Sequence, residues 1–575
     1  MRSLITLLST LVLLTLTACS STPSAATLDP DLRVDVAAST SGMVVSNSEQ
    51  ASQIGADILA RGGNAVDAAI AVQFALAVTW PEAGNIGGGG FMVVAPADTN
   101  SVTCIDYRET APAASTANMY TFGENRHHHR HVGVPGTVGG MALAYENYGT
   151  LPWAELVAPA IDLARNGFTI DEHLAASVNR VLESEKTQTA DNLAELRRVY
   201  SKPDGTPWEA SDTMTLPDLA HTLEIIAAQG ADGFYHGQVA KAFADDMANN
   251  AGIITADDLA SYHAKSRPAI STNYNGHTVY GAPPPSSGGV TITLILNMLE
   301  AFDTEGTSRY GSSRTHLLAE AMKRAFSERA KHLGDPDFVE IPVAQLTSKP
   351  YAHQLAGSIS MARVTPSEQL APPIELADES PSTTHFSIVD ASGMAVSNTT
   401  TLEQAWGSRI IPKGLGFVLN NEMGDFNWKP GYTDRTWKIG TPANVIEPGK
   451  RMLSSMSPTI VKREGEVVAV IGSPGGRTII NTVLGIIIST IDDQMPMPEA
   501  VEASRMHHQW FPDKIVVEDT YSDSTITALR TLGHTVEVRD GSQGAAHCIA
   551  VDPGTGVITG VGDYRRGGYA IAPSQ

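Results

Sequence analysis

Residues 380–404 read SPSTTHFSIVDASGMAVSNTTTLEQ and contain two strand-like runs joined by a short turn. A three-residue loop with glycine last separates Asp390 from Met394, which is typical of a type I turn closed by a left-handed glycine bulge. If Asp390 opposes Met394, Thr383 lies directly across the hairpin from Thr401. Directly opposed side chains in an antiparallel pair have Cβ atoms about 5 Å apart. The stretch therefore predicts two neighbouring hydroxyl groups at one end of a hairpin.

These hydroxyl groups suggest a nucleophile. A threonine hydroxyl attacks poorly unless a base lies beside it, and a free α-amine on the same residue, with an unperturbed pKa of about 8, can be that base. Thr383 gains such an amine only if the bond after Ser382 is cut, and the segment before it, 363–382, is rich in proline and acidic residues and reads as an extended connection. Glu403 is expected on the same face of the hairpin as Thr401. Taken alone, the stretch favours a simpler interpretation, because threonine is common in strands.

The composition is that of a large folded protein. The chain has 575 residues, 42% of them hydrophobic and 18% charged, enough for one large domain or two closely packed ones. The formal net charge of −23 argues against a nucleic-acid-binding protein, because such proteins need a basic face.

The N-terminus has the pattern of an export signal. A positive start and the apolar run 4–16 precede Leu-Thr-Ala-Cys19, which is similar to a bacterial lipobox with a lipidated cysteine. We expect residues 1–19 to be a lipoprotein signal and 20–35 a flexible tether, so that the protein is anchored to a membrane through Cys19 on the periplasmic side of the cell envelope. An ordinary secretory signal is the alternative.

The remaining cysteines and the histidines give little sign of a disulfide framework or a metal site. Only Cys104 and Cys548 remain after Cys19. Residues 126–131 (RHHHRH) could bind a metal, but so irregular a run is more typical of a solvated loop.

The first part of the chain is predicted to be mostly helical. Apolar residues at helical spacing indicate helices over 49–61 and 64–79, with Asn64 as the N-cap of the second. The stretch GNIGGGGFMVV (84–94) places its glycines before a strand, the reverse of a nucleotide-binding loop, so close backbone packing is expected there. Residues 140–260 read as mostly helical.

Strands dominate after residue 383. Hairpins are indicated at 383–401, 459–471 and 548–561, and an apolar helix within 473–491. Helices outside two sheets are the simplest packing of these elements.

Several longer stretches resemble the γ-glutamyltransferase family of N-terminal nucleophile hydrolases. They occur in family order and cover nearly the whole mature chain: GGNAVDAAIAVQFALAV, GNIGGGGF, YRETAP, GVPGTVGG, PPPSSGG, TTHFSIVD, LNNEMGDF, LSSMSPTIV, GSPGGR and HHQWFPD. The resemblance implies an α+β fold, a four-layer αββα sandwich with two stacked, mainly antiparallel sheets between helical layers. It also implies autocleavage before Thr383 into a large subunit, 36–382 after the tether, and a small catalytic subunit, 383–575, which stay together as a heterodimer.

The resemblance also assigns roles to the residues of the site. Thr383 matches the nucleophile and Thr401 its hydrogen-bonded partner, while the amides of Gly475 and Gly476 would hold the oxyanion before an apolar helix. The expected ligands of the substrate α-carboxylate are Arg108, Ser454 and Ser455, and those of the α-ammonium are Glu403, Glu422 and Asp425. Gly424 stands where an acidic residue is common in the family, so the contacts of that acidic side chain with its neighbours are not expected here.

The reaction expected is transfer of a γ-glutamyl group from glutathione or a related compound to water, an amino acid or a dipeptide, without a metal or other cofactor. A glutaryl-removing β-lactam acylase of the same family and a lipid-anchored binding protein without catalysis are the alternatives. Residues 427–450 match the place of a lid in some members, with Trp437 expected near the pocket entrance.

Overall fold

The computed structural model describes residues 32–97, 99, 101–121, 124–184, 193–304, 306–370, 383–428, 442–539 and 543–574. The expected signal with Cys19, most of the tether and the end of the linker before Thr383 lie outside these ranges. Residues 33–575 form one unit, separate from residues 1–32. None of the helices in the described ranges is long and apolar enough to cross a membrane.

Two antiparallel sheets form the centre of this unit. The first sheet contains the hairpin quoted above and runs, in spatial order, β19 (Tyr569–Ile571), β2 (Gly42–Ser46), β10 (Thr383–Asp390), β11 (Ala395–Thr401), β3 (Gly89–Ala95), β4 (Thr103–Asp106) and β7 (Lys265–Pro268). The second runs β1 (Asp35–Ser39), β18 (Ile558–Gly562), β17 (His547–Val551), β13 (Glu466–Ile471), β12 (Thr459–Arg463), β9 (His277–Gly281) and β8 (Ile270–Tyr274). Strands β10 and β11 contact β13 and β17, so the two sheets lie face to face.

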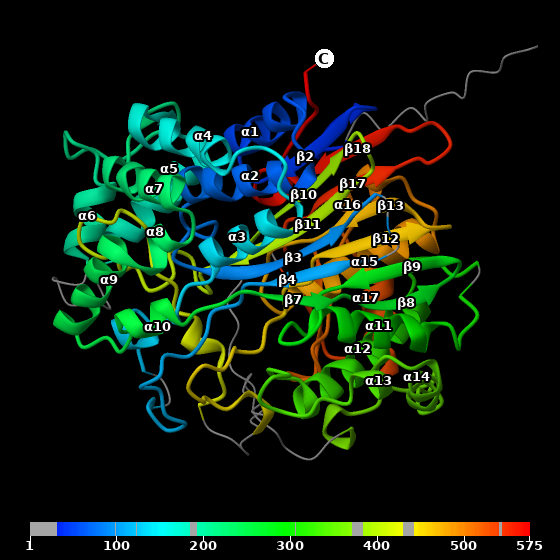
Figure 1. The fold of residues 1–575 in the computed structure, drawn as a ribbon. Coiled ribbons are helices and arrows are strands. Elements are labelled where there is room, and N and C mark those ends of the chain that lie inside the picture. The colour runs from blue at the N-terminus through cyan, green and yellow to red at the C-terminus, as the bar shows by residue number, and fades with distance from the viewer. Residues whose placement is uncertain are drawn as a thin grey trace, which may run out of the picture. The chain divides into compact units, whose positions relative to one another are not determined.

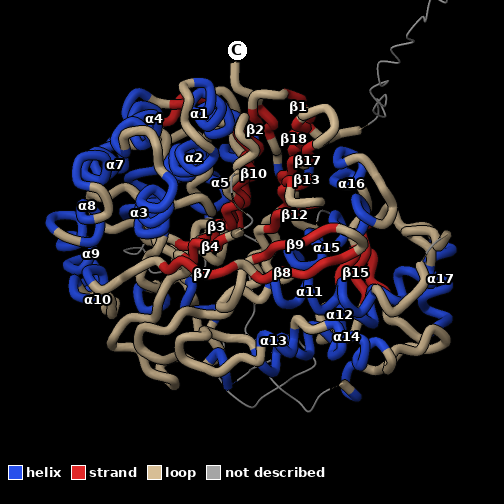
Figure 2. Tube along the Cα trace, turned by 45° about the vertical axis from the view of Figure 1, so that its right-hand side comes forward, coloured by secondary structure: helices blue, strands red, loops and turns tan. Residues whose placement is uncertain are grey.

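Helices cover the outer faces of both sheets (Figures 1 and 2). Beside the first sheet lie α1 (Glu49–Ala60), α2 (Ala65–Thr79), α3 (Thr137–Tyr148), α4 (Trp153–Asn166), α5 (Glu172–Glu183), α6 (Ala194–Tyr200), α7 (Pro217–Gln229), α8 (Asp232–Tyr235), α9 (Gly237–Asn249) and α10 (Ala256–Ala260). Beside the second lie α11 (Gly288–Leu299), α12 (Ser312–His332), α13 (Val343–Leu346), α14 (Lys349–Ala356), α15 (Thr478–Ile491), α16 (Met497–Glu502) and α17 (Asp523–Leu532). The predicted four-layer αββα arrangement is therefore confirmed.

Two smaller sheets complete the described strands. They pair β5 (Phe168–Thr169) with β6 (Thr213–Met214), and β15 (Ile515–Glu518) with β14 (Met506–His507) and β16 (Val536–Arg539).

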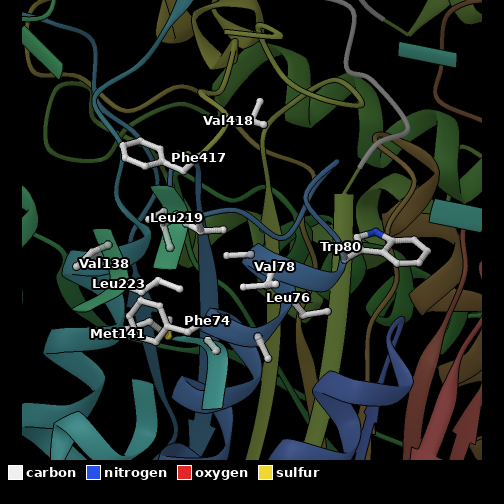
Figure 3. Close-up of a cluster of buried hydrophobic side chains, with 14 of the residues drawn as sticks. Phe74, Leu76, Val78, Trp80, Val138, Met141, Leu219, Leu223, Phe417 and Val418 are labelled. Atoms are coloured by element: carbon white, nitrogen blue, oxygen red, sulfur yellow. The ribbon is translucent and has the colours of Figure 1, made fainter. Parts of the chain in front are cut away.

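Helix α2 lies at the centre of the core on the first sheet's outer side. It contacts β10 and β11, and all of its residues are buried. Figure 3 shows its Phe74, Leu76 and Val78 beside side chains from α3 and α7. The predicted cap is confirmed, because Asn64 Oδ1 accepts from the backbone N–H of Asp67 while the Asp67 carboxylate accepts from the N–H of Asn64.

The glycine run before β3 is explained by close backbone packing, as predicted. A Cβ atom at Gly88 would lie 2.0 Å from the Thr401 carbonyl oxygen, and one at Gly90 would lie 2.2 Å from that of Thr399. Both distances are too short for any side chain. The glycines thus allow β3 to lie against the end of β11.

The hairpin register agrees with the sequence prediction. Thr383 is paired with Thr401, and the turn is closed by a hydrogen bond from the Asp390 N–H to the Met394 carbonyl (3.0 Å), with Gly393 at φ +88°. Asp390 also connects the turn to the core, because its carboxylate accepts from the N–H of Met394 (3.1 Å) and from that of Ala65 (2.9 Å), the first residue of α2. The predicted hairpins 459–471 and 548–561 are confirmed as well.

Replacing Asp390 by alanine should therefore destabilise the protein by about 2 kcal/mol, since a turn bond and a helix-end bond are lost together. Thermal or chemical unfolding measures the effect. Asp552→Ala is the matched control, because Asp552 makes turn bonds in the β17–β18 hairpin but is exposed, and it should cost less than about 1 kcal/mol. Equal losses for the two variants would contradict the role given to the α2 contact.

Candidate active site

One pocket collects all the residues predicted for the site except Gly475. It holds about 250 Å³ of space, part of it open to solvent, and is lined by Arg108, Thr383, Thr401, Glu403, Glu422, Asp425, Ser454, Ser455, Met456, Gly476 and Ile479. These residues come from stretches spread over positions 108–479 of the chain, so the pocket exists only in the folded molecule.

The two threonines lie at the start of β10 and the end of β11. The Thr383 and Thr401 hydroxyl oxygens are 3.5 Å apart, and Thr383 is 6% exposed. Thr401 Oγ1 also accepts from the Glu403 N–H at 2.9 Å. A hydroxyl that faces the pocket from a buried strand end, with a second hydroxyl fixed beside it, is placed to act as a nucleophile.

Glu403 reaches the pocket by a different route from the one predicted. Strand β11 ends at Thr401, so strand alternation does not apply to Glu403. Its backbone has φ +76°, a left-handed conformation that is costly for a non-glycine residue. The sequence located the side chain correctly but gave the wrong geometric reason.

Arg108 lies at the centre of a buried group of charges. It follows β4, is 1% exposed, and contacts Glu422 at 2.7 Å through Nη1 and Asp425 at 2.5 Å through Nη2. Its guanidinium also donates to the carbonyls of Met452 and Leu453, both at 3.3 Å. A buried guanidinium needs such partners. The cation and the anions that a zwitterionic amino-acid group requires are therefore side by side.

Burial changes the acidity of the carboxylates in this group. It raises the pKa of Glu109 to about 7, although Arg108 at 3.5 Å acts in the opposite direction. It also raises the pKa of Glu422 well above its ordinary value, again against the effect of Arg108. Both Glu109 carboxylate oxygens lack a hydrogen-bond partner among the described residues. Glu109, next to Arg108 in YRETAP, belongs to the charge group and was not singled out from the sequence.

Ser454 and Ser455 face the pocket from an extended segment before β12. The backbone of Ser454 pairs with PPPSSGG: its N–H donates to the Pro285 carbonyl (3.0 Å), and its carbonyl accepts from the Ser287 N–H (2.7 Å). Ser455 Oγ accepts from Arg329 Nη2 at 2.9 Å. This motif, residues 283–289, thus holds the serines in place.

The glycine pair comes before the apolar helix, as predicted, but the helix begins only at Thr478. Gly475 has φ +135° and Gly476 φ +57°, both in the left-handed region that favours glycine. Neither N–H group has an acceptor among the residues that the structure describes. Two backbone donors, one of them on the pocket wall, are therefore available at the positive end of a helix.

The histidine-rich run is not the solvated loop that its sequence suggested. His129 and His131 are buried; His129 Nε2 lies 3.0 Å from Asp246, and His131 stacks on Tyr120. Arg126 Nη1 forms an ion pair of 3.2 Å with Glu403. The sequence gave no signal for these contacts, because their partners are more than a hundred residues away or come from another loop.

The position of Arg126 accounts for the unusual Gly424. A Cβ atom at Gly424 would lie 3.0 Å from Arg126 Cδ and Nη1, so the glycine leaves space for this arginine beside the pocket. The expected lid lies largely outside the described residues, including Trp437. Trp428, at its start, packs against Tyr120 and His131.

The comparisons agree with the resemblance read from the sequence. The profile of the family described as Gamma-glutamyltranspeptidase matches residues 51–573. The glutathione hydrolase proenzyme of Escherichia coli (strain K12) is 42% identical over 531 residues, which cover 91% of this chain and 90% of the relative. The glutathione hydrolase proenzyme of Pseudomonas aeruginosa is 40% identical over 549 residues, covering 93% of each.

A solved structure also matches nearly the whole chain. The crystal structure of cephalosporin acylase from Bacillus halodurans superposes with a TM-score of 0.84 at 27% identity, covering 95% of this chain and 99% of that one.

The raised pKa of Glu109 predicts a pH-dependent loss of stability. Between about pH 4.3, where an unfolded glutamate releases its proton, and about pH 7, the folded state keeps a proton that the unfolded state has lost, so stability falls as the pH rises. Glu109→Gln should remove this component and gain on the order of 1–3 kcal/mol relative to wild type between pH 5 and pH 8. Unfolding temperatures at several pH values test it, with the exposed Glu155→Gln as control; parallel curves for wild type and Glu109→Gln would refute it.

Proposed function

This chain belongs to the gamma-glutamyltranspeptidase family, and we propose that it is a glutathione hydrolase and γ-glutamyltransferase. The observation that carries the proposal is the pocket in which Thr383 faces Thr401 beside an arginine and three carboxylates.

The enzyme first cuts its own chain. Hydrolysis of the bond between Ser382 and Thr383 consumes one water, leaves a carboxylate on Ser382 and makes the start of β10 a free N-terminus. The new α-amine then lies on the same residue as the attacking hydroxyl and can accept its proton near neutral pH. The relatives named as proenzymes support such processing. The products are a large piece that ends at Ser382, made of the tether 20–35 and the segment 36–382, and a small piece, 383–575.

Catalysis then proceeds through an acyl-enzyme. Thr383 Oγ1 attacks the γ-carbonyl carbon while Thr401 holds the hydroxyl by a hydrogen bond. The N–H groups of Gly475 and Gly476 stabilise the oxyanion, and the amine of the leaving group departs with a proton. Water, an amino acid or a dipeptide attacks the resulting γ-glutamyl ester and releases Thr383.

The pocket recognises the α-amino-acid end of the γ-glutamyl group. Its α-carboxylate binds to Arg108 with the hydroxyls of Ser454 and Ser455. Its α-ammonium binds to Glu422, Asp425 and Glu403. The substrate thus inserts one positive and one negative group into a cluster that already pairs such groups, and the net charge of the buried site stays the same.

An acylase acting on glutaryl side chains is the second candidate, since a cephalosporin acylase shares the fold. A glutaryl group has a carboxylate but no ammonium, so it has no use for three buried carboxylates. The acidic wall of the pocket therefore favours γ-glutamyl substrates. We further propose that the protein is held at the periplasmic side of the cell envelope by a lipid on Cys19, on the strength of the signal-like sequence before it.

Replacing Thr383 by alanine should abolish both cleavage and turnover. Intact mass of the purified protein, expressed without its signal, should show two fragments for wild type, the smaller beginning at Thr383, and one chain for the variant. Thr400→Val is the control, because the Thr400 hydroxyl donates to the Gly89 carbonyl and is not part of the pocket, and it should still be cleaved. A cleaved and active Thr383→Ala protein would rule out the assignment.

Asp425→Asn should separate the two candidate substrates. Losing a charged hydrogen bond to the ammonium should lower kcat/KM for a γ-glutamyl anilide about 100-fold, while a glutaryl anilide loses less than about tenfold. Steady-state kinetics with both anilides measures the difference. Preference of the wild-type enzyme for the glutaryl anilide would favour the acylase instead.

A further inference from the structure

We propose that Arg329, a buried arginine of α12, is a positioning residue that fixes both pocket serines as hydrogen-bond donors to the substrate α-carboxylate. This inference rests on the proposed function and adds a residue to its recognition of substrate. Arg329 does not line the pocket, and neither its position in the sequence nor the family resemblance indicated a role for it.

Arg329 contacts both serine-bearing segments from behind. It is 1% exposed, and its Nη2 donates to Ser455 Oγ at 2.9 Å. Its Nε donates to Ser287 Oγ at 2.8 Å, and Ser287 Oγ donates in turn to the Ser454 carbonyl at 2.7 Å. One guanidinium is thus connected directly to Ser455 and through Ser287 to the backbone of Ser454.

The direction of these bonds determines where the hydroxyl protons point. A guanidinium has only donors, so Ser455 Oγ must be the acceptor in its bond with Arg329. Ser454 Oγ is likewise an acceptor, of the Met456 N–H at 3.2 Å. Neither hydroxyl donates to an acceptor among the described residues. Each therefore keeps its proton for an acceptor in the pocket, which both serines line.

An acceptor in this place is a carboxylate oxygen of the substrate. Because the two O–H donors are already oriented, they need no reorganisation when an anion binds. The positive charge of Arg329, which is separated from the anion only by the Ser455 hydroxyl, further favours binding of the carboxylate. Without Arg329, Ser455 could turn its proton away from the pocket and Ser287 would lose the donor that orients it. Arg329 should therefore contribute to substrate binding more than to the chemical step.

A double-mutant cycle tests this inference in the full-length, cleaved enzyme. The variants are Arg329→Met, Ser455→Ala and the pair, assayed with a γ-glutamyl anilide. We expect Arg329→Met to raise KM about tenfold with kcat within about twofold, the pattern of lost uniform binding. In the Ser455→Ala background the same change should raise KM only about threefold, because only the path through Ser287 remains.

The control is Arg324→Met, which removes another buried arginine of α12, bonded to Glu320 and Ser358 and not to the pocket serines. It should leave KM within about twofold of wild type even if it lowers the unfolding temperature. If Arg329→Met does not accumulate as cleaved enzyme, Arg329→Lys replaces it in the cycle, with an expected rise in KM of about threefold, since a lysine keeps the charge but cannot bond both serines.

The outcomes are distinct. An unchanged KM for the Arg329 variant, or the same fold-change in both backgrounds, would overturn the positioning role. Absence of turnover of the γ-glutamyl anilide by the wild-type enzyme would instead refute the proposed function itself.

Discussion

The register of β10 against β11 is the constraint on which the whole site depends. Side chains alternate along a strand, so a slip of one residue in either strand would turn the threonine of that strand away from the pocket. The register is fixed at the turn by Asp390 and Gly393 and on either side by pairing of β10 with β2 and of β11 with β3. The first residue of α2, Ala65, donates its N–H to Asp390 in the same turn. Asp390 therefore helps to position both the core helix and the hairpin that carries the two threonines.

The second condition is that the buried charges of the site are paired with opposite charges. Arg108 can be buried because Glu422 and Asp425 contact it, and these acids tolerate burial because Arg108 is there. One guanidinium does not fully offset the burial of several carboxylates, so burial raises the pKa of both Glu109 and Glu422. A zwitterionic ligand suits such a cluster better than a singly charged one. It provides an anion for the arginine and a cation for the carboxylates without adding net charge.

Much of the fold could be predicted because its signals are local. The turn at Asp390, the cap at Asn64 and the glycines before β3 each follow from a few neighbouring residues. Contacts between distant segments gave no such signal: the burial of His129 and His131, the pairing of Arg126 with Glu403 and the left-handed backbone of Glu403 all depend on partners that only folding brings near. The chemically important residues were found through family motifs, and Arg329 was missed because helix α12 reads as a polar helix although nearly all of it is buried.

The order of strands in the two sheets gives the proposed cut a further meaning. Both sheets combine strands from before and after Thr383: β10 lies beside β2, β11 beside β3, and β12 beside β9. The two pieces therefore share both sheets and cannot part without breaking each of them. Once unfolded, however, they are separate molecules that must find each other, so refolding becomes a second-order reaction that slows on dilution. Cutting would thus leave the folded enzyme intact but make its refolding dependent on concentration, whereas the uncut chain folds as one molecule at a rate that dilution does not change.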